Sequence, residues 1–227
     1  MRLMNIDEEI PEFFYIFVGQ GSNKASQINY HNYKLTHKII SSGFESIMIQ
    51  HELIDSFIEG DIDYIPYIPN KTSFNVPSSH SLSVVNSYTT EYALERYRYN
   101  NNKMFPSRFS CVYAFGDIKS CELANKWNVN WDLNKVKKFK LSDLNIELGL
   151  SKAVKICKCN MDIVTYMWNH NLQFFDIEES DKICNAYWRG KGAIATEDQD
   201  IETGHTITMN SNVLYEYLIE GILEEIE

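Results

Sequence analysis

The sequence predicts an α+β fold, because strand-like and helix-like patterns both occur along one chain. Phe13–Val18 and Val213–Ile219 are near-continuous apolar or β-prone runs of strand length. Leu82–Tyr99 instead carries apolar and aromatic residues at helical spacing. With 227 residues and 44% hydrophobic content, the chain can bury one sizeable core. We therefore expect residues 1–227 to form a single domain.

A proline-led stretch, Phe105–Phe115, is the most informative part of the chain. Pro106 fixes its own φ angle and disfavours helix before it, so we expect a strand that begins near Arg108. Ser107, Arg108 and Ser110 are polar groups in this otherwise apolar stretch. Because unpaired buried polar groups are costly, these side chains are either satisfied internally or offered to a ligand.

The last predicted strand contains a single charge, Glu216. By alternation this residue shares a face with Leu214 and Leu218, which disfavours a solvated position if the strand is central. A carboxylate there requires either a structural ion partner or a function. Glu220 has the same parity, and we expect it at the strand end in water.

Several other elements follow from local signals. Asp117 is expected to cap a helix that runs through Lys126, with Cys121 and Ala124 facing inward. The proline-broken segment 61–79 is expected to cross the core as an extended loop and is a candidate lid, and 193–211 is expected to be an exposed loop. The remaining expectations are helices over Tyr33–Ile40, Glu52–Glu59 and Asp181–Arg189, the last closed by Gly190 and Gly192, and a half-exposed strand over Ala153–Met161.

Charge and the absence of targeting signals indicate a cytoplasmic protein. The net charge of −10 disfavours broad binding to a phosphate backbone or an anionic membrane. No apolar run is long enough to cross a membrane, and the N-terminus carries acids where a secretory signal needs basic residues. The lysines Lys135, Lys137, Lys138 and Lys140 are interpreted as a solvated face, although a short single-stranded nucleic acid stacked beside them stays open.

The cysteines and histidines give no metal signature. Five cysteines without regular spacing fit reduced thiols better than a disulfide framework. Cys157 and Cys159 share one face of the expected strand, and no second pair completes a zinc set, so we interpret them as core thiols.

Three segments together carry a family resemblance over about the second half of the chain. They are ALERYRYNNNKMFPSRF, SCVYAFGDIKSCELANKW, and the pair formed by AYWRGKG and the late strand VLYEYLIEG. This arrangement resembles the ADP-ribosyltransferase family. The resemblance implies two small, mostly antiparallel sheets packed together, flanking helices, and NAD as substrate in the cleft between the sheets.

The resemblance also assigns roles to particular residues. Glu216 matches the catalytic glutamate, which hydrogen-bonds a ribose hydroxyl and stabilises the oxocarbenium-like state as nicotinamide leaves. Tyr113 falls at the position of a nicotinamide-stacking tyrosine. Arg108, with Ser107 and Ser110 beside it, would bind the pyrophosphate, which requires a bulge or strand end because Tyr113 has the opposite parity.

The chain departs from the family on its first strand. Members usually carry His or Arg there to hold the NAD ribose, and FFYIFVG has neither. Tyr15, or Gln20 just beyond the strand, is one proposed substitute. Arg108 is the other, since it would supply the missing guanidinium for the pyrophosphate.

The function implied is mono-ADP-ribosyl transfer from NAD to a macromolecular acceptor, either RNA or DNA or a protein side chain. Intracellular relatives of this kind act as toxins or phage-defence effectors, which leaves room for an antitoxin or regulatory partner protein. Two alternatives stay open: an NAD glycohydrolase, and a catalytically inactive binding or inhibitor module with the same fold.

Overall fold

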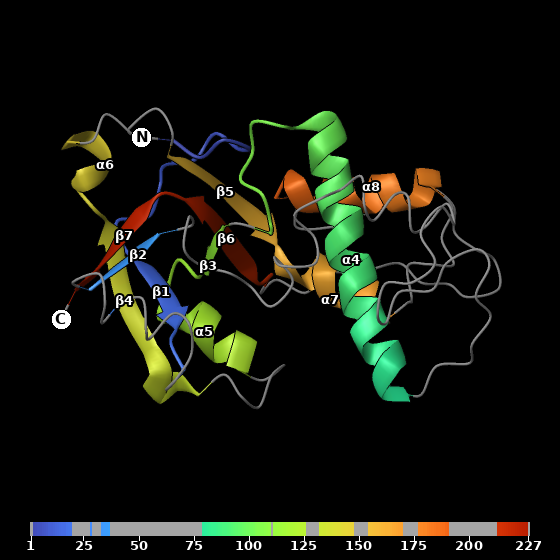
Figure 1. Ribbon diagram of the computed structural model, residues 1–227, viewed down its shortest axis with the longest axis horizontal. Coiled ribbons are helices and arrows are strands. Elements are labelled where there is room, and N and C mark those ends of the chain that lie inside the picture. The colour runs from blue at the N-terminus through green and yellow to red at the C-terminus, as the bar shows by residue number, and fades with distance from the viewer. Residues whose placement is uncertain are drawn as a thin grey trace, which may run out of the picture.

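The described strands form two small antiparallel sheets (Figure 1). A computed structural model describes residues 2–19, 28, 33–36, 79–109, 111–125, 132–147, 154–169, 177–190 and 213–226. The four-stranded sheet has the order β1-β4-β7-β2, with bounds Phe14–Phe17, Val136–Leu141, Ile222–Ile226 and Lys34–Thr36. The three-stranded sheet has the order β3-β6-β5, with bounds Val112–Ala114, Tyr215–Glu220 and Lys155–Asn160. Every pair of neighbouring strands is antiparallel, and the α+β prediction is confirmed.

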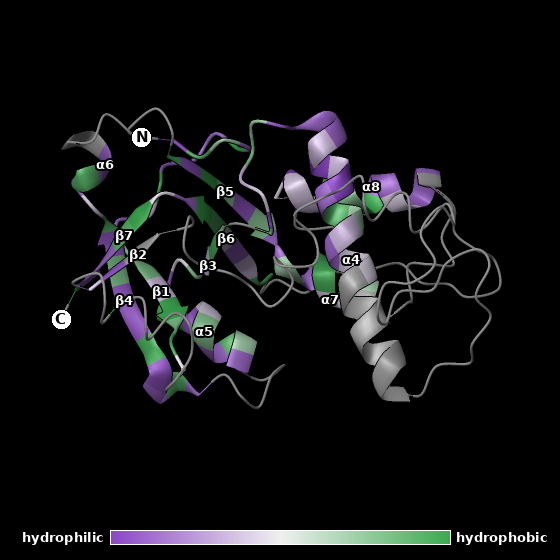
Figure 2. Ribbon diagram, viewed as in Figure 1, coloured by the Kyte–Doolittle hydropathy of each residue, from purple (hydrophilic) through white to green (hydrophobic). Residues whose placement is uncertain are grey.

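The two sheets are joined at two places. Gly221 separates β6 from β7, so the chain passes directly from the three-stranded sheet into the four-stranded one. Tyr15 of β1 and Phe115, just after β3, exchange two backbone hydrogen bonds of 2.8 Å. One buried cluster contains residues of both sheets, including Phe14, Ile16, Phe139, Tyr217, Ile219 and Leu223. Figure 2 shows hydrophilic and hydrophobic residues in succession along β4.

Three helices cover the other face of the three-stranded sheet. They are α4 (Ser79–Asn101), α7 (Met161–Asn169) and α8 (Ile177–Trp188), which lie together on one side of the molecule in Figure 1. Their buried cluster includes Leu94, Ile163, Val164 and Trp188, together with Leu218 of β6 and Cys157 of β5. The central strand β6 is therefore covered on both faces, as its sequence predicted, and its even-numbered residues face the helices.

Smaller elements complete the described part. α5 spans Ile118–Asn125, and the Asp117 carboxylate accepts the Ser120 N–H at 2.8 Å, so the predicted cap is confirmed. Cys121 and Ala124 are buried as expected. A short 3-10 helix, η1 (Leu133–Lys135), precedes β4, and α6 (Leu144–Glu147) follows it.

The N-terminal segment lines the outer edge of β5. Met4 N–H donates to the Ile156 carbonyl at 2.9 Å. The Asn5 side chain accepts from Lys158 N–H at 3.1 Å and donates to the Lys158 carbonyl at 2.7 Å and to the Trp188 carbonyl at 2.8 Å. This segment therefore satisfies backbone groups that an edge strand would otherwise expose.

Some expected elements are wrong or displaced. The expected helix over Tyr33–Ile40 is wrong at residues 34–36, which form β2, because Tyr33 has a φ of 64° and β7 pairs with this segment. The strand expected from Arg108 begins only at Val112. The expected strand over Ala153–Met161 ends at Asn160, whose side chain accepts the Asp162 N–H at 2.9 Å and starts α7, a helix that the sequence reading missed. Strand β7 was also missed.

Other expectations fall outside the described residues. These are the helix over Glu52–Glu59, the candidate lid up to residue 78, and the loop 193–211. Within the described part of the chain, no helix combines the length and apolar character needed to cross a bilayer.

Gly190 provides a direct test of this packing. It ends α8 with a φ of 58°, and an added Cβ would lie 2.7 Å from the Lys158 carbonyl oxygen. We expect Gly190→Ala to lower the free energy of unfolding by about 1 to 3 kcal/mol, because the backbone conformation and the contact are both unfavourable for alanine. Chemical denaturation measures this value. Gly221→Ala is the control, since its Cβ would meet neighbours at 3.5 Å and should change stability by less than about 0.5 kcal/mol; equal effects would contradict the expectation.

Candidate functional site

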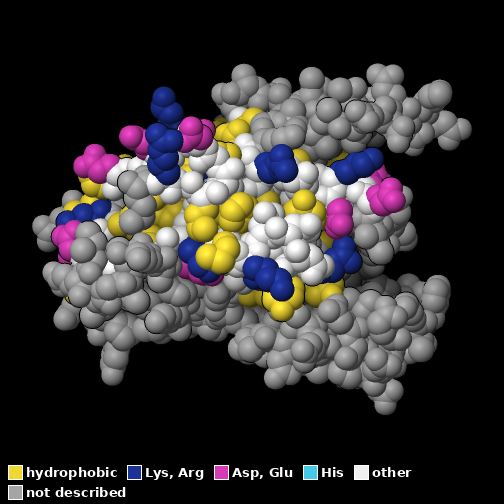
Figure 3. Space-filling view, turned by 90° about the horizontal axis from the view of Figure 1, so that it is seen from above, with side chains coloured by type: hydrophobic (Ala, Val, Ile, Leu, Met, Phe, Trp, Pro, Cys, Tyr) yellow, Lys and Arg dark blue, Asp and Glu magenta, His cyan; other side chains and the backbone are white. Residues whose placement is uncertain are grey.

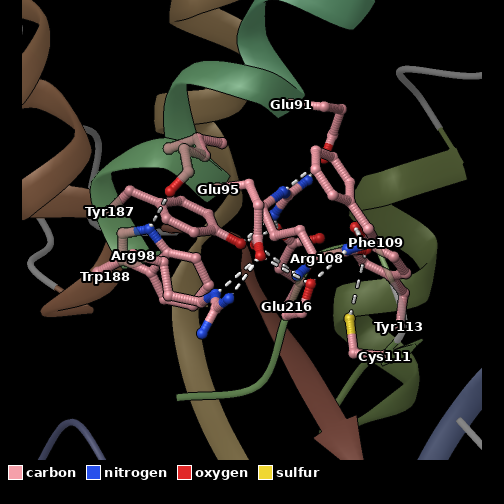
Figure 4. Close-up of polar contacts among 12 residues, drawn as sticks. Glu91, Glu95, Arg98, Arg108, Phe109, Cys111, Tyr113, Tyr187, Trp188 and Glu216 are labelled. Atoms are coloured by element: carbon pink, nitrogen blue, oxygen red, sulfur yellow. Dashed lines mark hydrogen bonds and ion pairs between the residues drawn. The ribbon is translucent and has the colours of Figure 1, made fainter. Parts of the chain in front are cut away.

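The candidate site is organised around the buried guanidinium of Arg108. The residue lies in the turn after Pro106, and its side chain is only 3% exposed. Its Nε and Nη2 donate to the two carboxylate oxygens of Glu91, both at 2.6 Å, and its Nη1 donates to Glu216 Oε1 at 2.6 Å. Figure 4 shows Arg108 between Glu91, which comes from α4, and Glu216, which comes from β6. Arg108 and Glu216, two of the predicted site residues, are therefore in direct contact.

Tyr187, near the end of α8, binds the same oxygen of Glu216 as Arg108 does. Its hydroxyl donates to Glu216 Oε1 at 2.7 Å and accepts from Arg108 Nη1. A phenol that donates in this way is neutral, and burial raises the pKa of Tyr187 well above its ordinary value. Arg108, Tyr187 and Glu216 thus form a closed triangle around one carboxylate oxygen.

Arg108 is held in its charged form by these neighbours. Burial alone lowers the pKa of Arg108, but Glu91, followed by Tyr113, Tyr187 and Glu216, raises it well above its ordinary value. The guanidinium also lies against the rings of Tyr113 and Tyr187, with its Cζ 5.1 and 5.0 Å from the two ring centroids.

A second buried carboxylate, Glu95, shapes the turn that presents Arg108. Glu95 Oε1 accepts from Arg98 Nε and Nη2 at 3.0 and 2.6 Å and from the Ser107 hydroxyl at 2.8 Å. Glu95 Oε2 accepts the backbone N–H of Arg108 at 3.1 Å. Ser107 and Arg108 are therefore held out of a regular strand by side-chain contacts, which is why β3 begins later than expected.

Glu220 also contributes to this turn. Its Oε1 accepts the Ser107 N–H at 2.8 Å, and its Oε2 pairs with Lys155 at 2.8 Å. The expectation that Glu220 lies in water is wrong, since its side chain is only 14% exposed.

Four members of this network were not predicted from the sequence: Glu91, Glu95, Arg98 and Tyr187. Glu91, Glu95 and Arg98 occur at spacings of four and three residues on the predicted long helix, which places them on one helical face. Charged residues on the face that also buries Leu94 are the signal that could have identified them. Tyr187 had no such signal, because an aromatic residue in a helix is normally a packing residue.

The remaining predicted site residues fall in different places. The Tyr113 hydroxyl donates to the Arg108 carbonyl at 2.6 Å, so Tyr113 belongs to the site. Tyr15 instead packs against a separate buried cluster that contains Phe115 and Cys121. Ser110 and Gln20 lie outside the described residues.

Two thiols lie beside the carboxylate cluster. Cys159 is the cross-strand partner of Glu216, and the Cys111 thiol lies 3.8 Å from the Arg108 carbonyl. Burial raises the pKa of both thiols well above their usual value, so they are protonated. Cys157 and Cys159 are both fully buried, which confirms the interpretation as core thiols. Among the described residues, no group of three or more His, Cys, Asp or Glu side chains could hold a metal ion.

One lysine of the predicted cluster forms an ion pair, and two others lie beside an acidic or an aromatic residue. Lys137 pairs with Glu225 at 2.7 Å, Lys140 lies opposite Glu224, and Lys138 lies 3.6 Å from the centre of the Phe13 ring. On the face seen from above in Figure 3, the described basic side chains lie among acidic and hydrophobic ones and form no continuous basic patch. A nucleic-acid contact at these lysines stays a prediction.

The geometry leaves one carboxylate oxygen available for chemistry. Both hydrogen bonds of Glu216 converge on Oε1, and Oε2 has no hydrogen-bond partner among the described residues. Glu216 itself is only 5% exposed. The site therefore presents an oriented, buried carboxylate oxygen that can accept a hydrogen bond or stabilise a positive charge.

No protein-family model matches the sequence, and no curated protein matches it either. The fold and the site are therefore interpreted from their own chemistry.

We expect Glu95→Ala to lower the free energy of unfolding by about 3 kcal/mol or more, because it removes the carboxylate partner of the buried Arg98 guanidinium and the acceptor of the Arg108 backbone N–H. Urea denaturation monitored by tryptophan fluorescence measures the change. Asp181→Ala is the matched control, since it breaks a 3.4 Å pair with Arg96 whose side chains are 33% and 43% exposed, and it should cost less than about 1 kcal/mol. A small effect of Glu95→Ala would show that this network is not structural.

Proposed function

We propose that this chain cleaves NAD and transfers ADP-ribose to a macromolecular acceptor, with Glu216 as the catalytic carboxylate. The observation that carries the proposal is the orientation of Glu216. Arg108 and Tyr187 fix one of its oxygens in the interior of the protein and leave the other without a partner in the described part of the chain. Such an arrangement suits a reaction in which positive charge develops next to a carboxylate.

The proposed reaction breaks the bond between the nicotinamide nitrogen and C1′ of the ribose. Nicotinamide leaves with the electron pair of that bond, so positive charge develops on the ribose. Glu216 Oε2 would accept a hydrogen bond from a ribose hydroxyl and stabilise that charge, as carboxylates do in glycoside cleavage. The acceptor oxygen or nitrogen then bonds to C1′ and loses its proton to solvent.

The other site residues have more modest proposed roles. Arg108 and Tyr187 hold Glu216 Oε1 in a fixed position, and Tyr113 is the candidate stacking partner for nicotinamide. Binding of the NAD pyrophosphate by Arg108 and Ser107, and of the ribose by Tyr15, stays a prediction. As the structure stands, Arg108 donates to Glu91 and Glu216, and Tyr15 packs in another cluster.

The fold is compatible with this proposal. Two small antiparallel sheets pack on a shared core, and the proposed catalytic glutamate lies on the central strand of one of them. We infer an ADP-ribosyltransferase-like fold on this basis. A role as a cytoplasmic toxin or phage-defence effector with a partner protein is proposed from the sequence resemblance alone.

A second candidate is an inactive binding module of the same fold. The observation that favours it is the ion pair itself, since Glu216 is paired with Arg108 and the two side chains are only 7% and 3% exposed. A module of this kind would bind a partner without turning over NAD.

Release of nicotinamide by the purified protein tests the proposal, with cellular RNA and protein offered as acceptors. We expect Glu216→Gln to reduce this rate by about a hundredfold to a thousandfold, because the amide cannot stabilise developing positive charge. Glutamine is preferable to alanine here, since alanine would remove an acceptor from the buried Arg108.

Glu225→Gln is the matched control for that measurement. Glu225 is also a partly buried strand glutamate paired with a basic residue, but it lies on β7 in the other sheet, so the rate should stay unchanged. An equal rate in Glu216→Gln and wild type would refute the assignment. Free ADP-ribose as the sole product would indicate a hydrolase, and no nicotinamide release under any condition would favour the binding module.

A further inference from the structure

The contact between Arg108 and Glu91 has the geometry of an oxyanion site. Two donors on one edge of the guanidinium, Nε and Nη2, each lie 2.6 Å from a carboxylate oxygen of Glu91. Guanidinium groups bind phosphates through the same two-point fork. The Glu91 carboxylate therefore occupies the place that a phosphate-type oxyanion would take.

The two carboxylates on Arg108 are not held equally. Glu216 lies on the central strand, is 7% exposed in its side chain, and also accepts the Tyr187 hydroxyl. The Glu91 side chain is 12% exposed, comes from the outer helix α4, and has Arg108 as its only hydrogen-bond partner among the described residues. Of the two carboxylates, Glu91 has fewer partners besides Arg108 and is the more exposed, so we infer that it is the one a ligand would displace.

Charge explains why an anion can enter only by exchange. In the folded site, the carboxylates of Glu91, Glu95 and Glu216 face the guanidiniums of Arg98 and Arg108, so negative charge is in excess by one. This excess repels an added anion. If Glu91 turns away, the charges of the two remaining carboxylates and the two guanidiniums balance. The Nε and Nη2 donors of Arg108 are then left without an acceptor, which is costly in a buried site.

We propose that the Nε and Nη2 edge of Arg108 is a binding site for a phosphate-type oxyanion and that Glu91 is a built-in competitor that fills it in the free protein. The exchange makes and breaks no covalent bond. The proposal rests on the proposed function only in naming the NAD pyrophosphate as the natural ligand. It also reconciles the predicted role of Arg108 with the ion pairs found in the structure.

Binding of inorganic pyrophosphate to the full chain, measured by isothermal titration calorimetry at constant ionic strength, tests this proposal. We expect Glu91→Gln to bind pyrophosphate about tenfold more tightly than wild type or better, because the competing charge is gone. Asp181→Asn removes the same charge from a pair with another α4 arginine, Arg96, and should leave the affinity unchanged. An affinity in Glu91→Gln no higher than in this control would overturn the proposal.

Two further arms locate the site. Adding Arg108→Lys to Glu91→Gln keeps the positive charge but removes the two-point fork, so the gain in affinity should be lost. A retained gain would place the anion elsewhere and overturn the proposal.

If Glu91→Gln folds only when pyrophosphate is present, the circular dichroism signal that returns with pyrophosphate supports the site. If it stays unfolded at millimolar pyrophosphate, the proposal fails. None of these outcomes depends on NAD cleavage, so they are separable from a failure of the proposed function.

Discussion

The buried guanidinium of Arg108 ties together parts of the chain that are far apart in sequence. Through its side chain it contacts Glu91 on α4, Glu216 on β6 and Tyr187 on α8. These elements form the helical layer and the central strand of the three-stranded sheet. The position of the proposed catalytic carboxylate therefore depends on how α4 and α8 pack on that sheet, and a shift of either helix would move it.

A buried cluster of this kind is not an efficient source of stability. Desolvation of several charges offsets much of their mutual attraction, and apolar residues of similar volume often stabilise a core as well. The cluster does impose a single geometry, because each guanidinium needs acceptors at fixed positions. The further carboxylate Glu95, which shapes the turn before β3, fits the same view, since its contacts serve to present Arg108 rather than to fill space.

Local patterns were enough to predict the elements whose periodicity matches their final environment. The strand β1, the long helix α4, the capped helix α5 and the doubly covered strand β6 all follow from spacing and capping. The segment at Tyr33 was predicted wrongly because pairing with β7 overrides its helical pattern, and β7 itself is determined by that long-range pairing. α7 was missed because Met161 was assigned to the end of the preceding strand, although it is the first residue of a helix that Asn160 caps.

The candidate site was predictable for a different reason. Arg108 and Glu216 are conspicuous as charges inside apolar stretches, so each pointed to a buried partner or a ligand. Their partners could not be predicted, because nothing in the local sequence states that the face of α4 bearing Glu91 meets the turn after Pro106. Tyr187 was hidden for the same reason, since only the fold reveals that its hydroxyl reaches Glu216.

The most direct test of this account is a double-mutant cycle between Arg108 and Glu216. The free energy of unfolding is measured by urea denaturation for wild type, Arg108→Met, Glu216→Gln and the double variant. The account predicts a favourable coupling of about 2 kcal/mol, because each side chain is the other's buried partner. Additive effects, with a coupling near zero, would show that the two side chains do not meet and would contradict the account.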